Sequence, residues 1–149
     1  MEENLIEVQS TQYIVVDLGI EQYGIDIKYV DNIVRMQKIT RVPKAQDFYR
    51  GVINLRGEIV PVMSLRKKFG LEEDVFTDKT RIIILRLDQR EAIGVVVDNV
   101  KEVVSLESDN IDKVSNSNDE KKYYISAVGK NQDNLISLLN VNLIIDELS

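Results

Sequence analysis

The chain has 149 residues, 44% of them hydrophobic and 30% charged, so it is long enough for one domain with a buried core and is unlike a disordered protein. It contains no cysteine and no histidine, which excludes disulfides, thiolate nucleophiles, cysteine-ligated metals and the commonest general base. Its 25 acidic and 19 basic residues give a net charge of -6, which disfavours a large phosphate-binding surface for nucleic acid.

Two features of the sequence argue against a membrane protein. Charged residues break the apolar runs well short of the roughly 20 residues that span a bilayer. The first ten residues are acidic and lack the basic and then apolar pattern of a signal peptide. We expect a cytoplasmic protein with no direct membrane insertion.

The N-terminal part of the chain predicts a β-hairpin with an ambiguous segment after it. Thr11–Leu18 is rich in β-branched residues and is followed, after a short turn, by a second strand-like run at Tyr23–Ile27. Lys28–Arg35 has apolar residues near the helical spacing but spans only two turns, so it is either a short helix or a single turn that leads into a strand. A short strand ending at Pro43 comes next, and then a polar link that could be helical.

The most distinctive run of the sequence is "RGVINLRGEIVPV", which alternates like a strand on both sides of a turn. Val52–Leu55 and Glu58–Leu65 form the two arms of a predicted hairpin, with Arg56 and Gly57 at its tip. Gly57 suits the positive φ of a tight turn. Pro61 has no N–H, so its strand is expected at a sheet edge or at a bulge.

The second half of the chain repeats the plan of the first. After a short helix ended by Gly70, the runs Arg81–Leu87 and Ala92–Val100 predict another hairpin. It matches the first hairpin at an offset of about 70 residues, which aligns Gly94 with Gly24. A C-terminal run similarly matches the second arm of the central hairpin. That match aligns Ile59, Val62 and Leu65 with Leu135, Leu138 and Val141.

The closely spaced hairpins and the lack of long amphipathic helices predict a mostly β fold with short helices, built as two small barrels or sandwiches. Half of this chain is near the lower limit of independent stability, so the two halves should share one core. We expect a single domain over 11–149 that consists of two β subdomains, approximately 11–78 and 79–149. The boundary between them holds only if the two subdomains do not interlock. The polar run Ser115–Lys122 is expected to form a mobile surface loop.

The acidic clusters do not predict catalysis. Their carboxylates have no apolar setting that would raise a pKa, so a solvated surface is the better interpretation of all of them. They lie at Asp26 with Asp31, at Glu72–Asp74, and at Asp109 with Asp112.

Other conspicuous residues have structural explanations as well. The basic cluster Arg66–Lys68 has no interleaved aromatic residues, so we expect it to decorate a helix rather than to bind nucleic acid. Turn and close-packing roles suffice for the scattered glycines, among them Gly51, Gly57 and Gly94.

Two positions also have a functional interpretation. Arg56 is either a solvated turn residue or a rigidly mounted guanidinium that offers five donors to a partner. The aliphatic residues after the first hairpin are mainly core, but Val30 or Val34 is a candidate for an exposed docking patch.

Four stretches resemble the CheW-like family of bacterial chemotaxis coupling proteins: "YGIDIKYVDNI", "ITRVP", "RGVINLRGEIVPVMSLRKKFG" and "AIGVVVDNVKEVVSL". The resemblance runs from about Thr11 to the C-terminus, and its central motif is highly specific. It implies two intertwined five-stranded β-barrels resembling SH3 domains. It also implies a non-catalytic adaptor, without cofactor or metal, that joins the cytoplasmic tips of chemoreceptors to the regulatory domain of the histidine kinase CheA. Such an adaptor is recruited from the cytoplasm to membrane-associated receptor arrays.

The resemblance also implies which residues bind the receptor. The receptor-contacting arginine of the "NLRG" turn falls on Arg56, and apolar residues of a groove between the barrels fall on Val30 and Ile33. Where the family commonly has glutamate, this chain has Asn32, which can donate and accept hydrogen bonds but cannot form a salt bridge. No comparably specific motif marks the surface that faces CheA.

Two other functions compete with this one. A small β-barrel that binds nucleic acid or another ligand is opposed by the net charge of -6 and by an aromatic content of only six Tyr and three Phe. An enzyme based on carboxylates, or a sugar-binding β-protein, is opposed by the missing histidine and cysteine.

Overall fold

The computed structural model describes residues 10–43, 45–88, 91–114 and 124–148. The surface loop expected at Ser115–Lys122 lies outside these residues. In chain order the elements are β1 (Ser10–Leu18), β2 (Glu21–Asp26), η1 (Ile27–Tyr29), β3 (Val30–Arg35), β4 (Tyr49–Leu55), β5 (Glu58–Ser64), α1 (Leu65–Lys68), β6 (Arg81–Leu85), β7 (Ile93–Val97), β8 (Asn99–Glu107), η2 (Ser108–Asn110), β9 (Ile111–Lys113), β10 (Ile125–Asn131), β11 (Asn134–Leu139) and α3 (Val141–Leu148). The chain is mostly β with short helices, as the sequence predicts.

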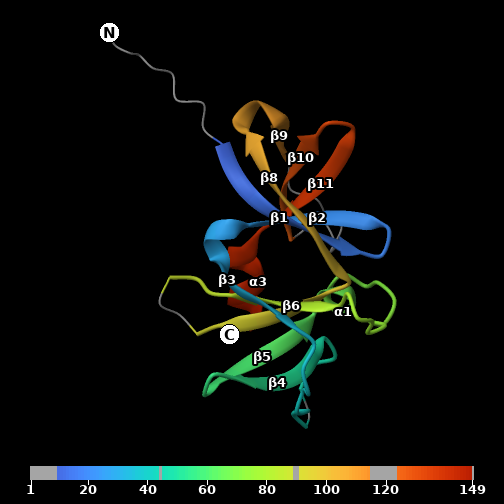
Figure 1. Ribbon diagram of the computed structural model, residues 1–149, viewed down its shortest axis with the longest axis vertical. Helices are drawn as coiled ribbons and strands as arrows, with labels where there is room; N and C mark the ends of the chain where they lie inside the picture. Colours follow the sequence, from blue (N-terminus) through green and yellow to red (C-terminus); the bar gives the residue numbers. More distant parts are fainter. Residues whose placement is uncertain (1–9, 44, 89–90, 115–123, 149) are drawn as a thin grey trace.

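The strands form two sheets, one above the other in Figure 1. The six-stranded sheet has the order β8-β1-β2-β11-β10-β9, and the five-stranded sheet has the order β3-β6-β7-β5-β4. We call them the first and second barrels. The second barrel closes because the segment after β3 reaches β4, where Thr40 and Val52 exchange two backbone hydrogen bonds of 2.8 Å. The first barrel has one strand more than the resemblance implies, the short β9.

The two barrels interlock along the chain. The first barrel takes β1 and β2 from the N-terminal half and β8 to β11 from the C-terminal half, while the second takes all of β3 to β7. A boundary near residue 78 therefore falls inside the second barrel, between α1 and β6. Each hairpin of a repeat packs with strands from the other repeat, so neither half of the chain can complete a barrel alone.

The largest hydrophobic cluster lies between the barrels, and we call it the shared core. α3 also lies between the two sheets, and its side chains belong to this cluster (Figure 1). The shared core includes Ile14, Leu18, Tyr23, Ile25, Leu65, Phe69, Ile83, Leu85, Val97 and Ile144. Each barrel has a smaller interior cluster of its own, built around Ile82 and Ile84 in the second barrel and around Val15 and Leu138 in the first.

The predicted duplication holds at the level of single residues. Gly24 of β2 is the parallel partner of Leu138, and Gly94 of β7 is the parallel partner of Val62. A Cβ atom at Gly24 would lie 2.7 Å from Leu138 Cδ2, and one at Gly94 would lie 2.8 Å from Ile82 Cγ2. Neighbouring side chains crowd both glycines at the same point of the repeat, so a larger residue at either position would force these neighbours to shift.

The structure also resolves the segments that the sequence left open. Lys28–Arg35 is a single 3-10 turn leading into a strand, since η1 ends at Tyr29 and β3 follows at once. Pro61 pairs with Val52 of β4, while the pairing of β5 with β7 begins only at Val62. At Pro61 the strand thus has one sheet neighbour, which suits a residue without an N–H. None of the described helices is long and apolar enough to cross a membrane.

Candidate functional site

Arg56 lies at the tip of the hairpin formed by β4 and β5. Leu55 pairs with Glu58, so Arg56 and Gly57 are the two residues of the turn, and their φ angles are +55° and +84°. The Gly57 N–H donates a hydrogen bond of 3.0 Å to Asn54 Oδ1, which stabilises the backbone conformation of the turn. A left-handed conformation costs a non-glycine residue about 1–2 kcal/mol, and such strain often accompanies function.

The Arg56 guanidinium is exposed and has no hydrogen-bond or ion-pair partner within the described residues. Its neighbour Glu58 is already bound, because Arg86 Nη2 donates to Glu58 Oε1 at 3.0 Å. The same nitrogen donates to Asp31 Oδ2 at 3.3 Å. These hydrogen bonds, first of all the one that Arg86 donates to Glu58, raise the pKa of Arg86 above its ordinary value. Arg86 therefore links the Arg56 turn to β3, where the other predicted site residues lie.

A bulge in β3 brings Val30 and Ile33 onto one face. Val30 pairs with Leu85 and Ile33 pairs with Ile83, and both partners point into the shared core. With regular alternation, residues three apart would point to opposite faces, but an extra residue at Asp31 shifts the register. Val30 is half-buried against the shared core, and Ile33 is 37% exposed at its margin.

Asn32 lies on the opposite face of β3. It pairs with Ile84, whose side chain belongs to the interior of the second barrel. The Asn32 Oδ1 atom accepts a hydrogen bond of 2.9 Å from the Ile33 N–H. The structure thus places Val30 and Ile33 on one face of β3 and Asn32 on the other, while the Arg56 hairpin is linked to β3 through Arg86. Val34 pairs with Ile82 and also packs on the barrel interior.

The same arrangement recurs on β8, which the sequence interpretation missed. Val100 pairs with Val16 and Val103 pairs with Ile14, with Lys101 as the extra residue between them. Val100 packs on the shared core, and Val103 is 52% exposed. The signal was present in the sequence, because the offset of about 70 residues that aligned the hairpins also aligns these two pairs.

The basic cluster of α1 is engaged within the molecule. Arg66 Nε and Nη2 donate to the two oxygens of Asp98 at 2.8 and 2.5 Å. The Lys67 Nζ atom lies 2.8 Å from Glu73 Oε1, and the Lys68 Nζ atom lies 4.2 Å above the ring centre of Phe48. These contacts engage all three basic side chains of α1 within the molecule.

One interpretation of the acidic clusters is wrong. The Asp74 side chain is not solvated but only 2% exposed, with its Oδ2 atom 2.8 Å from Arg50 Nη2. Arg50, 24 positions away in sequence, supplies the opposite charge that a buried carboxylate needs, and nothing in the local pattern indicates that pairing. Within the described ranges, no three of the acidic residues are grouped as a metal site would require.

Comparisons with known proteins agree with this architecture. The model of the CheW-like domain matches residues 12–149. The chemotaxis protein CheW of Bacillus subtilis is 33% identical over 130 residues, which are 87% of this chain and 83% of that protein. The CheW of Klebsiella aerogenes is 40% identical over 105 residues, 70% of this chain and 63%, just under two thirds, of that protein.

A solved structure extends the agreement to the whole fold. The scaffolding protein TtCheW from Thermoanaerobacter tengcongensis superimposes with a TM-score of 0.82 at 30% identity, over 89% of this chain and 90% of that one. The chain belongs to the CheW-like domain family, a family of chemotaxis scaffold proteins and not of enzymes.

Proposed function

We propose that this protein couples the cytoplasmic tip of a chemoreceptor to the regulatory domain of CheA, and that Arg56, Val30 and Ile33 contact the receptor. The observation that carries the proposal is the bulge at Asp31, because it puts Val30 and Ile33 on one face of β3. Arg86 connects this bulge to Glu58, in the hairpin that carries Arg56. Arginine is enriched at protein-binding hot spots, and the partly exposed Val30 and Ile33 would supply apolar surface for the same contact. Asn32 would support this surface by accepting the hydrogen bond from the Ile33 N–H, without touching the receptor itself.

This function needs no cofactor, nucleic acid or membrane insertion. The protein would be held at membrane-associated receptor arrays by its receptor contact and would carry CheA through a different surface. Val30 is half-buried and Ile33 is 37% exposed, so the apolar area that these two offer a receptor is small. The receptor contact should therefore depend strongly on Arg56.

The proposal is tested by replacing Arg56 with Glu. Reversing a charge at an interface costs about 2–5 kcal/mol of binding free energy where the partner group is desolvated. Calorimetric titration with a receptor cytoplasmic fragment should therefore show a large loss of affinity, while CheA binding and the thermal midpoint change little. Lys130→Glu, an exposed charge reversal on β10, is the matched control. Equal receptor affinities for Arg56→Glu and Lys130→Glu would refute the assignment.

A further inference from the structure

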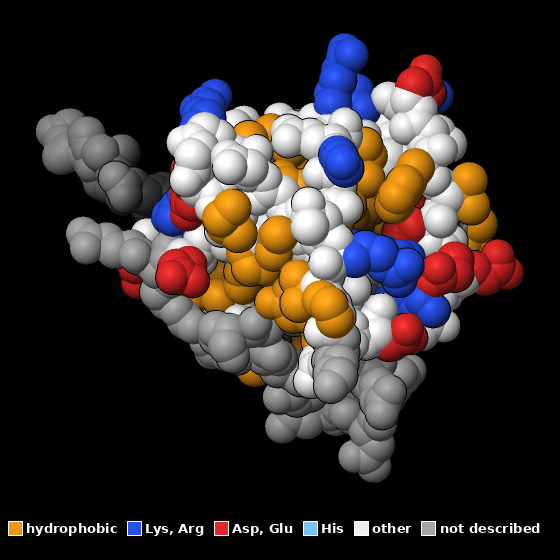
Figure 2. Space-filling view, turned by 90° about the horizontal axis from the view of Figure 1, so that it is seen from below, with side chains coloured by type: hydrophobic (Ala, Val, Ile, Leu, Met, Phe, Trp, Pro, Cys, Tyr) orange, Lys and Arg blue, Asp and Glu red, His pale blue; other side chains and the backbone are white. Residues whose placement is uncertain are grey.

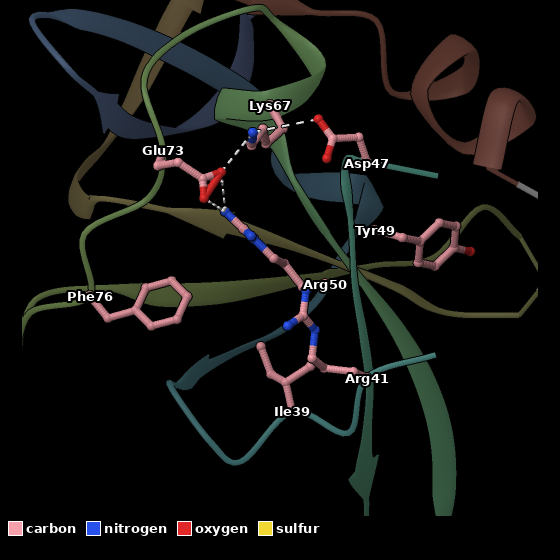
Figure 3. A pocket seen from close by; sticks show the side chains of 8 residues that line it. All are labelled: Ile39, Arg41, Asp47, Tyr49, Arg50, Lys67, Glu73 and Phe76. Atoms are coloured by element: carbon pink, nitrogen blue, oxygen red, sulfur yellow. Dashed lines mark hydrogen bonds and ion pairs between the residues drawn. The ribbon is translucent and has the colours of Figure 1, made fainter. Parts of the chain in front are cut away.

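A pocket of about 470 Å³ opens on the side of the second barrel, at the end of β4 away from Arg56. Its lining residues are Ile39, Arg41, Asp47, Tyr49, Arg50, Lys67, Glu73 and Phe76 (Figure 3). Arg56 lies six positions after Arg50 along β4 and its turn, which is about 20 Å of extended strand. The pocket is thus distinct from the receptor surface proposed above, and we call it the Arg41 pocket.

One wall of the Arg41 pocket is held rigid by ion pairs. Arg50 Nη2 lies 2.8 Å from Asp74 Oδ2 and 3.4 Å from Glu73 Oε1. Lys67 Nζ lies 2.8 Å from Glu73 Oε1 and 3.5 Å from Asp47 Oδ2, so these charges form one connected network (Figure 3). Because each of these two cations already has acidic partners, neither is free for a ligand.

Arg41 differs from these two cations. Its side chain is exposed, and it forms no ion pair or hydrogen bond with the part of the chain that the structure describes. In Figure 3 its guanidinium lies below Arg50, outside the network of dashed lines. A guanidinium with unused donors matches the two oxygens of a carboxylate.

Apolar side chains surround this free charge. Phe76 and Ile39 line the pocket, and Phe76 is 51% exposed. Val75 and Val42, the chain neighbours of Phe76 and Arg41, are 76% and 46% exposed. Figure 2 looks onto this end of the molecule and shows hydrophobic side chains gathered beside basic and acidic ones. Such an exposed group of apolar residues is typical of a protein interaction site.

We propose that the Arg41 pocket binds an acidic segment of a partner protein, with a carboxylate side chain on Arg41 and a neighbouring apolar side chain on Phe76 and Ile39. Of the described cations that line the pocket, only Arg41 lacks an acidic partner, which matches one carboxylate and not a row of phosphates. Val42 and Val75 are exposed at the positions next to Arg41 and Phe76, which favours a chain segment with apolar side chains over a small carboxylate.

In the test, the full chain is titrated with a seven-residue peptide that carries one glutamate between two leucines. Binding is monitored by NMR. We expect saturable shifts of the Arg41 Nε–H and of backbone amides near Phe76. Binding should weaken about tenfold or more in Arg41→Gln and for the peptide with glutamine in place of glutamate. Phe76→Ser should weaken it as well, and Lys130→Gln should not. The exposed, unpaired Arg41 can be replaced without unfolding, which an unchanged thermal midpoint verifies.

Three results would overturn the proposal. The first is the absence of saturable shifts, or shifts that persist unchanged in Arg41→Gln. The second is binding of acetate with the same affinity as the peptide, which would mean that the pocket is a site for small anions. The third is tighter binding of an oligothymidylate at the same residues. Since none of these measurements involves a receptor or CheA, they can fail while the Arg56 test succeeds.

Discussion

Arg86 holds the carboxylate of Glu58 at 3.0 Å, two residues from the free guanidinium of Arg56. Glu58 is the nearest acidic residue to Arg56 along the hairpin. Without Arg86, the Glu58 carboxylate would be free to pair with Arg56. The arrangement keeps Arg56 available because a third residue binds the competing carboxylate. Arg86 also binds Asp31, so the same side chain ties the hairpin tip to the bulge of β3.

Replacing Arg86 with Gln should weaken receptor binding by several-fold, even though Arg86 is not proposed to contact the receptor. The freed Glu58 would then pair with Arg56 and compete with the receptor for it. Since these are largely exposed ion pairs, the free energy of unfolding should fall by only about 1 kcal/mol or less. Calorimetric titration with the receptor fragment measures the first effect and urea unfolding the second.

A second substitution separates competition from simple loosening of the turn. If Glu58 competes for Arg56, the double variant Arg86→Gln with Glu58→Gln should recover most of the lost receptor affinity. If the affinity of the double variant is no better than that of Arg86→Gln, the positioning role assigned to Arg86 is wrong.

Ile33 and Asn32 should respond differently to substitution because the bulge directs them to opposite faces of β3. Ile33→Ser removes an apolar group that is 37% exposed, so receptor affinity should drop, and the thermal midpoint should fall moderately because the rest of the side chain is buried. Asn32→Ala should have the smaller effect on affinity, since it removes one hydrogen bond to the Ile33 N–H. The reverse order of affinities would mean that Asn32 is itself a contact residue.

The sequence was sufficient to predict the two barrels and much of their internal symmetry. Alternation and turn residues located the hairpins, and the match of Gly24 with Gly94 identified a repeat that the parallel pairings confirm. These features are local, or depend on identity at a fixed offset. A close match to the CheW-like motifs supplied the rest of the fold.

Features that depend on distant pairing were not predictable in the same way. The extra residue at Asp31 arises from how β3 meets β6, which lies about fifty residues further along the chain. The burial of Asp74 depends likewise on Arg50, far away in sequence. Neither strand register nor an ion pair of this kind leaves a mark in local composition, so the acidic run containing Asp74 looked solvated.

Gly51 and Gly57 provide a matched pair for testing backbone strain. Both have positive φ, +135° at Gly51 and +84° at Gly57, but a Cβ at Gly51 would lie 2.1 Å from the Thr40 carbonyl oxygen while one at Gly57 meets nothing within 4 Å. Gly57→Ala should therefore cost about 1–2 kcal/mol of unfolding free energy. Gly51→Ala should cost about 3 kcal/mol or more, because it must also displace the backbone that closes the barrel.

Denaturant unfolding of the two variants measures the difference. Comparable costs at the two positions would show that the contact of Thr40 with β4 yields easily, and would weaken the description of the second barrel as closed.

The ion pair of Arg66 with Asp98 should make stability depend on pH in the acid range. Hydrogen bonds from Arg66, and one of 2.8 Å from the Gly19 N–H, lower the pKa of Asp98 below its ordinary value of 3.8, although partial burial opposes them. The carboxylate thus joins α1, the start of β8 and the turn between β1 and β2. A folded-state pKa below the unfolded one means that the contribution is present above about pH 3.8 and is lost as the pH falls through the folded-state value.

Asp98→Asn should accordingly lower the free energy of unfolding by about 1–3 kcal/mol at pH 7, the range for hydrogen bonds to charged groups. The difference from wild type should shrink as the pH is lowered below 3.8, because the wild-type carboxyl then becomes neutral as well. Urea unfolding of both proteins from pH 7 down to pH values where the native state still persists gives the two curves. Asp112→Asn, on the exposed edge of β9, is the control and should follow wild type throughout. A difference between wild type and Asp98→Asn that stays constant over this range would mean that Asp98 stabilises the junction by shape and not by charge.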